Sequence, residues 1–175
     1  NSFFELLYHD NLNQYDIYAF SDQDDIWLKD KLKRAILHLQ ETPVPQLYYS
    51  SATLVNENLE VLVEDFGSRP VYDKTMVLTQ NFSQGCTMVF NYQAYKLITS
   101  YRPPYSFSHD IWIPILCTYF GKVVYDNKSS ILYRQHNSNV ASGIKSTLRN
   151  QLKSRINQLK TEDNYYYYSK ALLEG

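Results

Sequence analysis

Apolar and polar positions along the chain follow two alternating periods, one typical of strands and one typical of helices. Short runs such as YDIYAF and QLYYSS have the length and the aromatic content of strands. The segment 27–40 has instead the three- and four-residue spacing of an amphipathic helix. Its apolar residues on one face are Leu28, Leu32, Ile36 and Leu39. Strands that alternate with helices in this way predict an α/β protein.

The predicted elements follow one another along the whole chain. The segment TLVNENLEVLVED, with two apolar runs around an Asn-rich turn, predicts a β-hairpin. Asn91 and Asp110 are of the residue type that caps helix N-termini, so a helix is predicted after each. Helices are predicted over residues 2–12, 27–40, 92–100, 110–121 and from 144 onwards. Strands are predicted over residues 16–21, 46–51, 86–90, 122–126 and 130–135, with the last two closing a single sheet.

Composition narrows the classes of protein that fit this pattern. The 175 residues are 44% hydrophobic and 20% charged, which is typical of one globular domain with a core. The net charge of -1 gives no general affinity for polyanions, so we expect no nucleic-acid partner. Residues 1–30 carry seven acids and one Lys, whereas residues 127–161 carry seven Lys or Arg and no acid. This asymmetry predicts a cation site near the start and an anion-binding surface near the end.

The two cysteines and the absence of long apolar runs bear on the cellular compartment in which the protein is expected. Cys86 and Cys117 are 31 positions apart without a C-x-x-C pair, so the sequence predicts reduced, buried thiols and neither a zinc site nor a disulfide framework. No apolar run approaches the roughly 18 residues that span a bilayer, and no signal peptide is visible. We therefore expect a cytoplasmic protein. The chain opens on NSFFELL, the start of a helix, and we expect natural sequence to precede Asn1.

Three carboxylates crowd into the segment SDQDD, directly after the strand YDIYAF. In open α/β sheets ligands collect outside the carboxyl ends of strands, and this segment lies at such an end. Asp22 and Asp24, at positions i and i+2, can converge on a divalent ion, or on a metal and a ribose hydroxyl together, while Asp25 can cap the next helix. The alternative is an acidic turn with a helix cap and no metal.

Four motifs occur in order over about residues 1–140, namely FSDQDDIWLKDKL, NFSQGCTMVFN, HDIW and ILYRQHNSNV. Together they resemble the family-2 glycosyltransferases of GT-A fold, in particular the bacterial rhamnosyltransferase-like members. The family begins with strands that carry T-Y-N and D-D-x-S type motifs for the nucleoside, and neither motif is present here. The resemblance therefore implies a GT-A type mixed sheet with flanking helices, truncated at its N-terminus, over residues 1–143. Residues 144–175 would form a C-terminal helical tail.

The resemblance also implies a reaction and residues to perform it. A family member of this kind is an inverting, metal-dependent enzyme that moves a sugar, here rhamnose or another hexose, from a nucleotide-diphospho-sugar to a glycan or lipid-linked acceptor in cell-surface polysaccharide synthesis. Mg²⁺ or Mn²⁺ held by Asp24 and supported by Asp22 would neutralise the departing diphosphate. Asp110 of the H-D pair would be the general base, and the alternative is a plain helix cap.

Further residues of the four motifs would complete the site. His136 would be a metal ligand or diphosphate contact and Arg134 a phosphate contact, unless both are ordinary polar residues at a strand end. The expected acceptor and sugar pocket consists of Gly85, Cys86, His109 and Trp112. Gly85 would allow a close approach of the backbone, and the alternative for SQGCT is a plain turn. Trp27 and Trp112 could stack on a sugar, and the alternative for both is a place in the core.

The tail and the chain as a whole leave alternatives open. The segment from Ile144 to Leu159 has an apolar stripe bordered by Lys and Arg, which suits peripheral contact with the inner face of an anionic membrane. Packing on its own domain, or on a second subunit in a homodimer, fits the same pattern. A non-catalytic remnant or binding module of glycosyltransferase shape is the alternative function. A metal-dependent phosphohydrolase would need more His or Asp ligands than the sequence offers.

Overall fold

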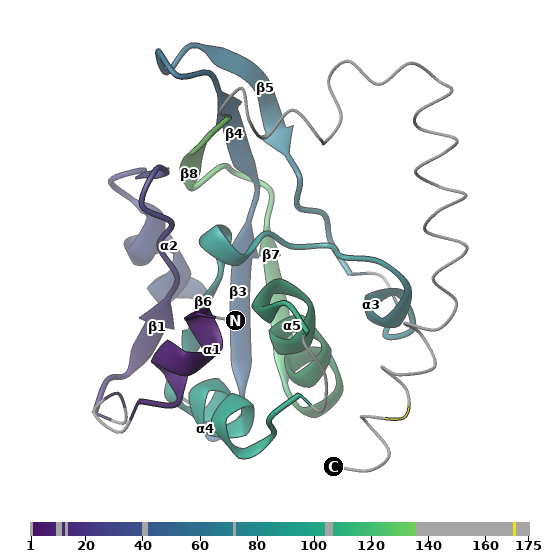
Figure 1. The fold of residues 1–175 in the computed structure, drawn as a ribbon. Helices are drawn as coiled ribbons and strands as arrows, with labels where there is room; N and C mark the ends of the chain where they lie inside the picture. Colours follow the sequence, from purple (N-terminus) through teal and green to yellow (C-terminus); the bar gives the residue numbers. More distant parts are fainter. Residues whose placement is uncertain are drawn as a thin grey trace. The chain divides into compact units, whose positions relative to one another are not determined.

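The computed structural model describes residues 2–9, 12, 14–39, 42–71, 73–103, 107–135 and Lys170. The described residues up to Arg134 belong to one compact unit of mixed α/β structure (Figure 1). The boundary predicted at residue 143 and, except for Lys170, the predicted tail 144–175 lie outside the described residues. No described helix combines the length and the apolar character that a bilayer-spanning segment needs.

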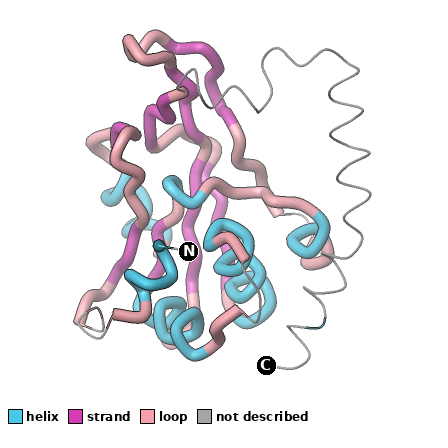
Figure 2. Tube along the Cα trace, in the orientation of Figure 1, coloured by secondary structure: helices cyan, strands magenta, loops and turns pink. Residues whose placement is uncertain are grey.

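In the described part of the chain, the strands form two mixed four-stranded sheets (Figure 2). The order is β1-β6-β3-β7 in the first sheet and β2-β8-β4-β5 in the second. Each sheet contains one parallel pair, β3 with β7 and β4 with β8, and its other pairs are antiparallel. The strands are β1 (Ile17–Ala19), β2 (Ile26–Trp27), β3 (Gln46–Ser50), β4 (Ala52–Val55), β5 (Val61–Phe66), β6 (Val89–Asn91), β7 (Lys122–Asp126) and β8 (Ile131–Arg134).

The mixed α/β architecture was predicted, but the single sheet was wrong. The chain passes from the first sheet into the second three times, at residues 20–25 between β1 and β2, at Ser51 between β3 and β4, and at residues 127–130 between β7 and β8. At the last two crossings the two segments stay hydrogen-bonded, because Ser51 N–H donates to the Asp126 carbonyl and Ser130 N–H donates to the Ser51 carbonyl. The two parallel pairs therefore continue one another along the molecule.

Helices cover both faces of the first sheet. In Figure 1, α2 (Lys31–His38) lies behind the sheet and α5 (His109–Phe120) lies in front of it. Ala35 of α2 packs against Tyr48 of β3 and Val89 of β6. All five residues of β3 are buried, as expected for a strand that is covered on both faces. The remaining helical elements are α1 (Ser2–Leu7), α3 (Met76–Thr79), the 3₁₀ turn Gly85–Thr87 and α4 (Tyr92–Ser100).

Helix α2 differs from its prediction in both its start and its buried face. It begins at Lys31 and not near residue 27, because Ile26 and Trp27 pair with β8 as strand β2. Lys31 and Ala35 are buried, whereas Leu32 and Ile36 of the predicted apolar face are 37% and 51% exposed. The pairing of β2 thus fixes which side of the following helix meets the sheet.

Local polar contacts confirm some predicted boundaries and correct others. Asn91 caps α4, since its side-chain oxygen accepts the Ala94 N–H at 2.9 Å, and the same oxygen accepts the Gln46 N–H of β3. The predicted hairpin is present as β4 and β5. Asp110 is not the cap of α5, because Ser108 takes that position. The strand predicted from residue 86 begins only at Val89, after the 3₁₀ turn.

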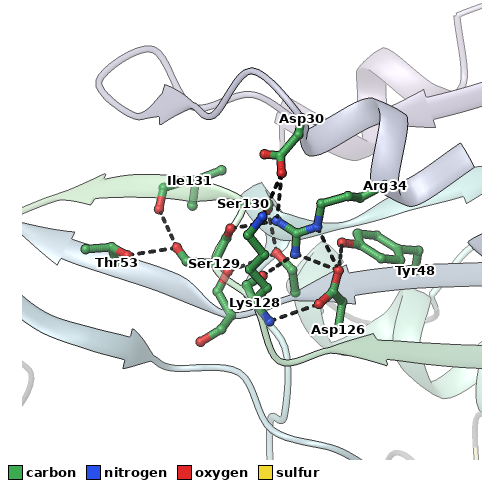
Figure 3. A network of polar contacts seen from close by, with 11 residues as sticks. Asp30, Arg34, Tyr48, Thr53, Asp126, Lys128, Ser129, Ser130 and Ile131 are labelled. Atoms are coloured by element: carbon green, nitrogen blue, oxygen red, sulfur yellow. Dashed lines mark hydrogen bonds and ion pairs between the residues drawn. The ribbon is translucent and has the colours of Figure 1, made fainter. Parts of the chain in front are cut away.

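An ion pair between Arg34 and Asp126 joins α2 to the end of β7 (Figure 3). Arg34 Nη2 and Nε lie 2.6 and 3.0 Å from Asp126 Oδ2, and both side chains are 13% exposed. Tyr48 donates its hydroxyl to the same oxygen at 2.8 Å, and Arg34 also donates to the carbonyls of Lys128 and Ser129. Burial alone would raise the pKa of Asp126, but hydrogen bonds from the Lys128 backbone N–H, Arg34 and Tyr48 hold the pKa below its usual value.

We predict that Arg34→Met lowers the free energy of unfolding by about 3 kcal/mol, because it leaves Asp126 buried without its cation. Lys128→Met is the matched control. Lys128 pairs with Asp30 at the surface, and its loss should cost less than about 1 kcal/mol. Urea unfolding measures both. Equal losses of unfolding free energy in the two variants would contradict a structural role of the pair formed by Arg34 and Asp126.

The same pair predicts a pH dependence. Because the pKa of Asp126 is lower in the folded state, its contribution is present above the ordinary aspartate value of about 4 and is lost as the pH falls through the folded value. Wild type should therefore lose more stability than Arg34→Met on acidification. The free energy of unfolding is measured against pH for both proteins. An equal loss on acidification in the two would contradict this prediction.

Candidate functional site

The acidic turn predicted as a cation site leaves β1 at its carboxyl end and leads into β2. Asp22 is half-buried there, and burial, followed by repulsion from Asp24, raises the pKa of its carboxyl. His109 and Lys31 oppose this rise, while Asp110 adds to it. Groups from the same turn, from α2 and from the distant start of α5 therefore act on one carboxylate.

Asp25 has a different role from the predicted helix cap, which was wrong. Its Oδ1 accepts the backbone N–H of Arg134 at 3.1 Å, so the residue joins the acidic turn to the end of β8. Its Oδ2 is buried and has no hydrogen-bond partner among the described residues. Burial raises the pKa of this carboxyl, although the Arg134 N–H and the nearby Cys86 thiol partly offset the effect. A buried carboxylate oxygen is thus left available at the site.

Asp22, Asp25 and Cys86 form a cluster that we call the DDC cluster. One donor atom of each residue lies within 4.8 Å of the donor atoms of the other two. The carboxylate oxygens fit Mg²⁺ or Mn²⁺, which prefer oxygen ligands. Burial raises the pKa of the Cys86 thiol far above its usual value, so the sulfur stays protonated and does not suit such an ion. Asp24 lies in the same turn outside this group, and its role as a metal ligand stays a prediction.

Lys31 lies beside the DDC cluster and was missed by the sequence analysis. Its side chain is 1% exposed, its amine donates a hydrogen bond to the Cys86 carbonyl, and Nζ lies 4.0 Å from the centroid of the Trp27 ring. Burial lowers its pKa to about 8, although Asp25 and Asp22 act in the opposite direction. Lys31 lies on the side of α2 that faces the sheet. A pattern of apolar positions alone does not predict that a lysine is buried there.

His109 fills the space that Gly85 leaves open. A Cβ atom on Gly85 would lie 2.1 Å from His109 Nε2, so only glycine fits beneath the ring. The imidazole also packs against Phe3 and Phe20, with ring centroids 4.3 and 4.8 Å away. Burial lowers the pKa of His109, which favours the neutral ring near pH 7. The close approach predicted at Gly85 is therefore made by this imidazole.

Asp110, the predicted general base, follows His109 in the first turn of α5. Its Oδ2 accepts a hydrogen bond from Asn81 Nδ2 at 3.0 Å. Its Oδ1 is buried and has no hydrogen-bond partner within the described ranges. Through its charge Asp110 acts on both Asp22 and His109. The structure thus brings the SDQDD turn and the H-D pair close enough for their charges to act on each other.

The remaining predicted site residues lie apart from this group or outside the described residues. Trp112 is 2% exposed, its ring stacks on Phe107 at 5.4 Å, and its indole N–H donates to the Tyr101 carbonyl. These contacts place it in the core, which was the alternative to a place in the acceptor pocket. Arg134 reaches Asp25 through its backbone N–H. His136 lies outside the described residues.

Comparison with known proteins gives a partial match to a curated protein. No family model matches the chain. A dTDP-rhamnosyl transferase, RfbG, of Shigella flexneri is 29% identical to it over 154 residues, which is 79% of this chain and 49% of that protein. This similarity relates the chain to glycosyltransferases. The chain spans about half the length of the curated relative it matches.

We predict that Gly85→Ala destabilises the protein by about 1–3 kcal/mol, because the new Cβ atom overlaps a ring that Phe3 and Phe20 hold in place. In a His109→Ala background, where the ring is absent, the same change should cost little. Thermal unfolding of the four proteins measures this coupling. An equal cost of Gly85→Ala in both backgrounds would contradict it.

Proposed function

We propose that this chain carries the metal-binding and acceptor-side part of an inverting glycosyltransferase of GT-A fold and of family 2. The observation that carries the proposal is the convergence of Asp22, Asp25 and Asp110, from turns up to 88 positions apart, around the turn at Gly85–Cys86. Sugar transfer needs a cation at the leaving diphosphate and a base near the acceptor. The partial similarity to a sugar transferase supports the same assignment.

The proposed donor is a nucleotide-diphospho-sugar, and the name of the Shigella relative favours dTDP-rhamnose. The proposed acceptor is a glycan or a lipid-linked sugar. Asp22 and Asp25, with Asp24 of the same turn, would hold Mg²⁺ or Mn²⁺, which when bound supplies positive charge to the leaving diphosphate. Contact of the basic tail with a membrane surface, or with a second copy of the chain, is part of this proposal and lies outside the described residues.

Asp110 is proposed to take the proton of the acceptor hydroxyl. An inverting displacement is in line, so the base must lie on a different side of the sugar from the diphosphate. Asp110 belongs to α5, whereas the carboxylates proposed for the metal belong to the turn between β1 and β2. Asn81 holds one oxygen of Asp110, which orients the carboxylate and leaves Oδ1 for a substrate proton. His109 and Gly85 fix the start of the helix that carries it.

Asp110→Asn should keep donor binding and stability while transfer falls by roughly 10²- to 10⁴-fold, the usual contribution of a positioned base. The measurement is steady-state transfer by the full-length enzyme, with donor affinity measured separately. Loss of the hydrogen bond from Asn81 to Asp110 would not by itself explain such a decrease in transfer. Asn81→Ala therefore serves as a control with a smaller expected effect. Near-normal turnover of Asp110→Asn would remove the residue from the reaction.

Asp22→Asn and Asp24→Ala should each abolish Mn²⁺-dependent binding of a nucleoside diphosphate and leave the fold intact, because the turn lies at a strand end. Glu64→Gln, at an exposed position of β5, is the matched control and should bind as wild type does. Calorimetric titration of full-length protein measures all four proteins. Unchanged binding by the two aspartate variants would refute the metal role, and a full-length protein that binds no donor at all would favour the non-catalytic module.

A further inference from the structure

Lys31 is the one charged side chain in the described part of the chain that is fully buried. Two contacts hold its amine beside the DDC cluster, the hydrogen bond to the Cys86 carbonyl and the position over the Trp27 ring. Cys86 is itself a member of the cluster, and Trp27 belongs to the strand that follows the acidic turn. These contacts hold the ammonium group where the charges of both carboxylates act on it, without a direct ion pair to either.

Neither the buried ammonium group of Lys31 nor the pair of carboxylates is stable on its own. A buried ammonium that has lost its water is costly unless opposite charge lies near it. Two carboxylates whose oxygens lie within 4.8 Å of each other repel unless a positive charge lies near them. Lys31, Asp22 and Asp25 meet both needs at once, since each carboxylate attracts the ammonium.

We propose that Lys31 is the internal counter-cation of the DDC cluster, holding Asp22 and Asp25 together without a metal and limiting how tightly the cluster binds a divalent ion. The second half of this statement rests on the proposed function, because it takes the cluster as the metal site. The first half concerns the folded chain alone. Lys31 thus acts as a positioning residue that reaches the reaction only through the carboxylates.

The first half is tested in the 175-residue chain with a chelator present. Lys31→Met keeps the stem that packs near Trp27 and removes the charge. Thermal unfolding is measured for Lys31→Met, Asp25→Asn and the double variant. We expect Lys31→Met to lower the unfolding midpoint in wild type and to have less than about half that effect in Asp25→Asn, because the repulsion it exposes is then smaller. Equal shifts in both backgrounds would overturn the counter-cation role and leave Lys31 an anchor for the Cys86 carbonyl.

Lys33→Met on the exposed side of the same helix is the control, and it should show no coupling to Asp25→Asn. Lys31→Gln is measured in parallel, because it removes the charge but keeps a donor for the Cys86 carbonyl. This variant tests the proposal even where Lys31→Met does not fold. Coupling of Lys31→Gln to Asp25→Asn supports the role of charge, and its absence overturns it.

The second half is tested by calorimetric titration with Mn²⁺ alone. Removing one positive charge beside the carboxylates should tighten Mn²⁺ binding by at least about tenfold in Lys31→Met or Lys31→Gln. A purely structural lysine would give equal or weaker binding, and either result overturns this half. Absence of Mn²⁺ binding in wild type and variants alike refutes the metal site of the proposed function together with the second half. The double-mutant cycle then still decides the first half.

Discussion

The ion pair of Arg34 with Asp126 determines the position of the elements on which the candidate site is built. Lys31 and Arg34 lie one turn apart on α2, so fixing one side chain on β7 fixes the other beside the DDC cluster. Asp126 ends β7, and the following turn, whose carbonyls Arg34 also binds, leads into β8. Because β8 pairs with β2 and its last residue donates to Asp25, the same contacts set where the acidic turn ends.

The site itself is a set of ionisable groups kept in unfavourable surroundings. Burial raises the pKa of Asp22 and Asp25 and lowers that of Lys31 and His109, so each of these charged forms is disfavoured. Such clusters are common where a protein binds ions or moves protons, because isolated groups in a stable core would be replaced by apolar ones. The attraction between Lys31 and the carboxylates reduces this cost without removing it.

Part of this arrangement follows from the sequence because it depends on local chemistry. The cap at Asn91, the hairpin of β4 and β5, and the glycine at position 85 each follow from residue type and spacing. The buried face of α2 and the bond from Arg134 to Asp25 depend instead on pairing between β2 and β8, more than 100 positions apart. No local pattern encodes such a pairing, so the sequence suggested Asp25 as a cap and overlooked Lys31.

The most direct test is whether the turns at residues 22–25 and 85–86 form one cation site with the turn at residues 109–110 close beside it. Substoichiometric Mn²⁺ broadens the NMR signals of nearby amides, so a spectrum of the ¹⁵N-labelled chain reports all three turns at once. We expect the amides of all three turns to broaden together, before those of the exposed acidic strand β5. Broadening confined to one turn, or strongest on β5, would contradict it.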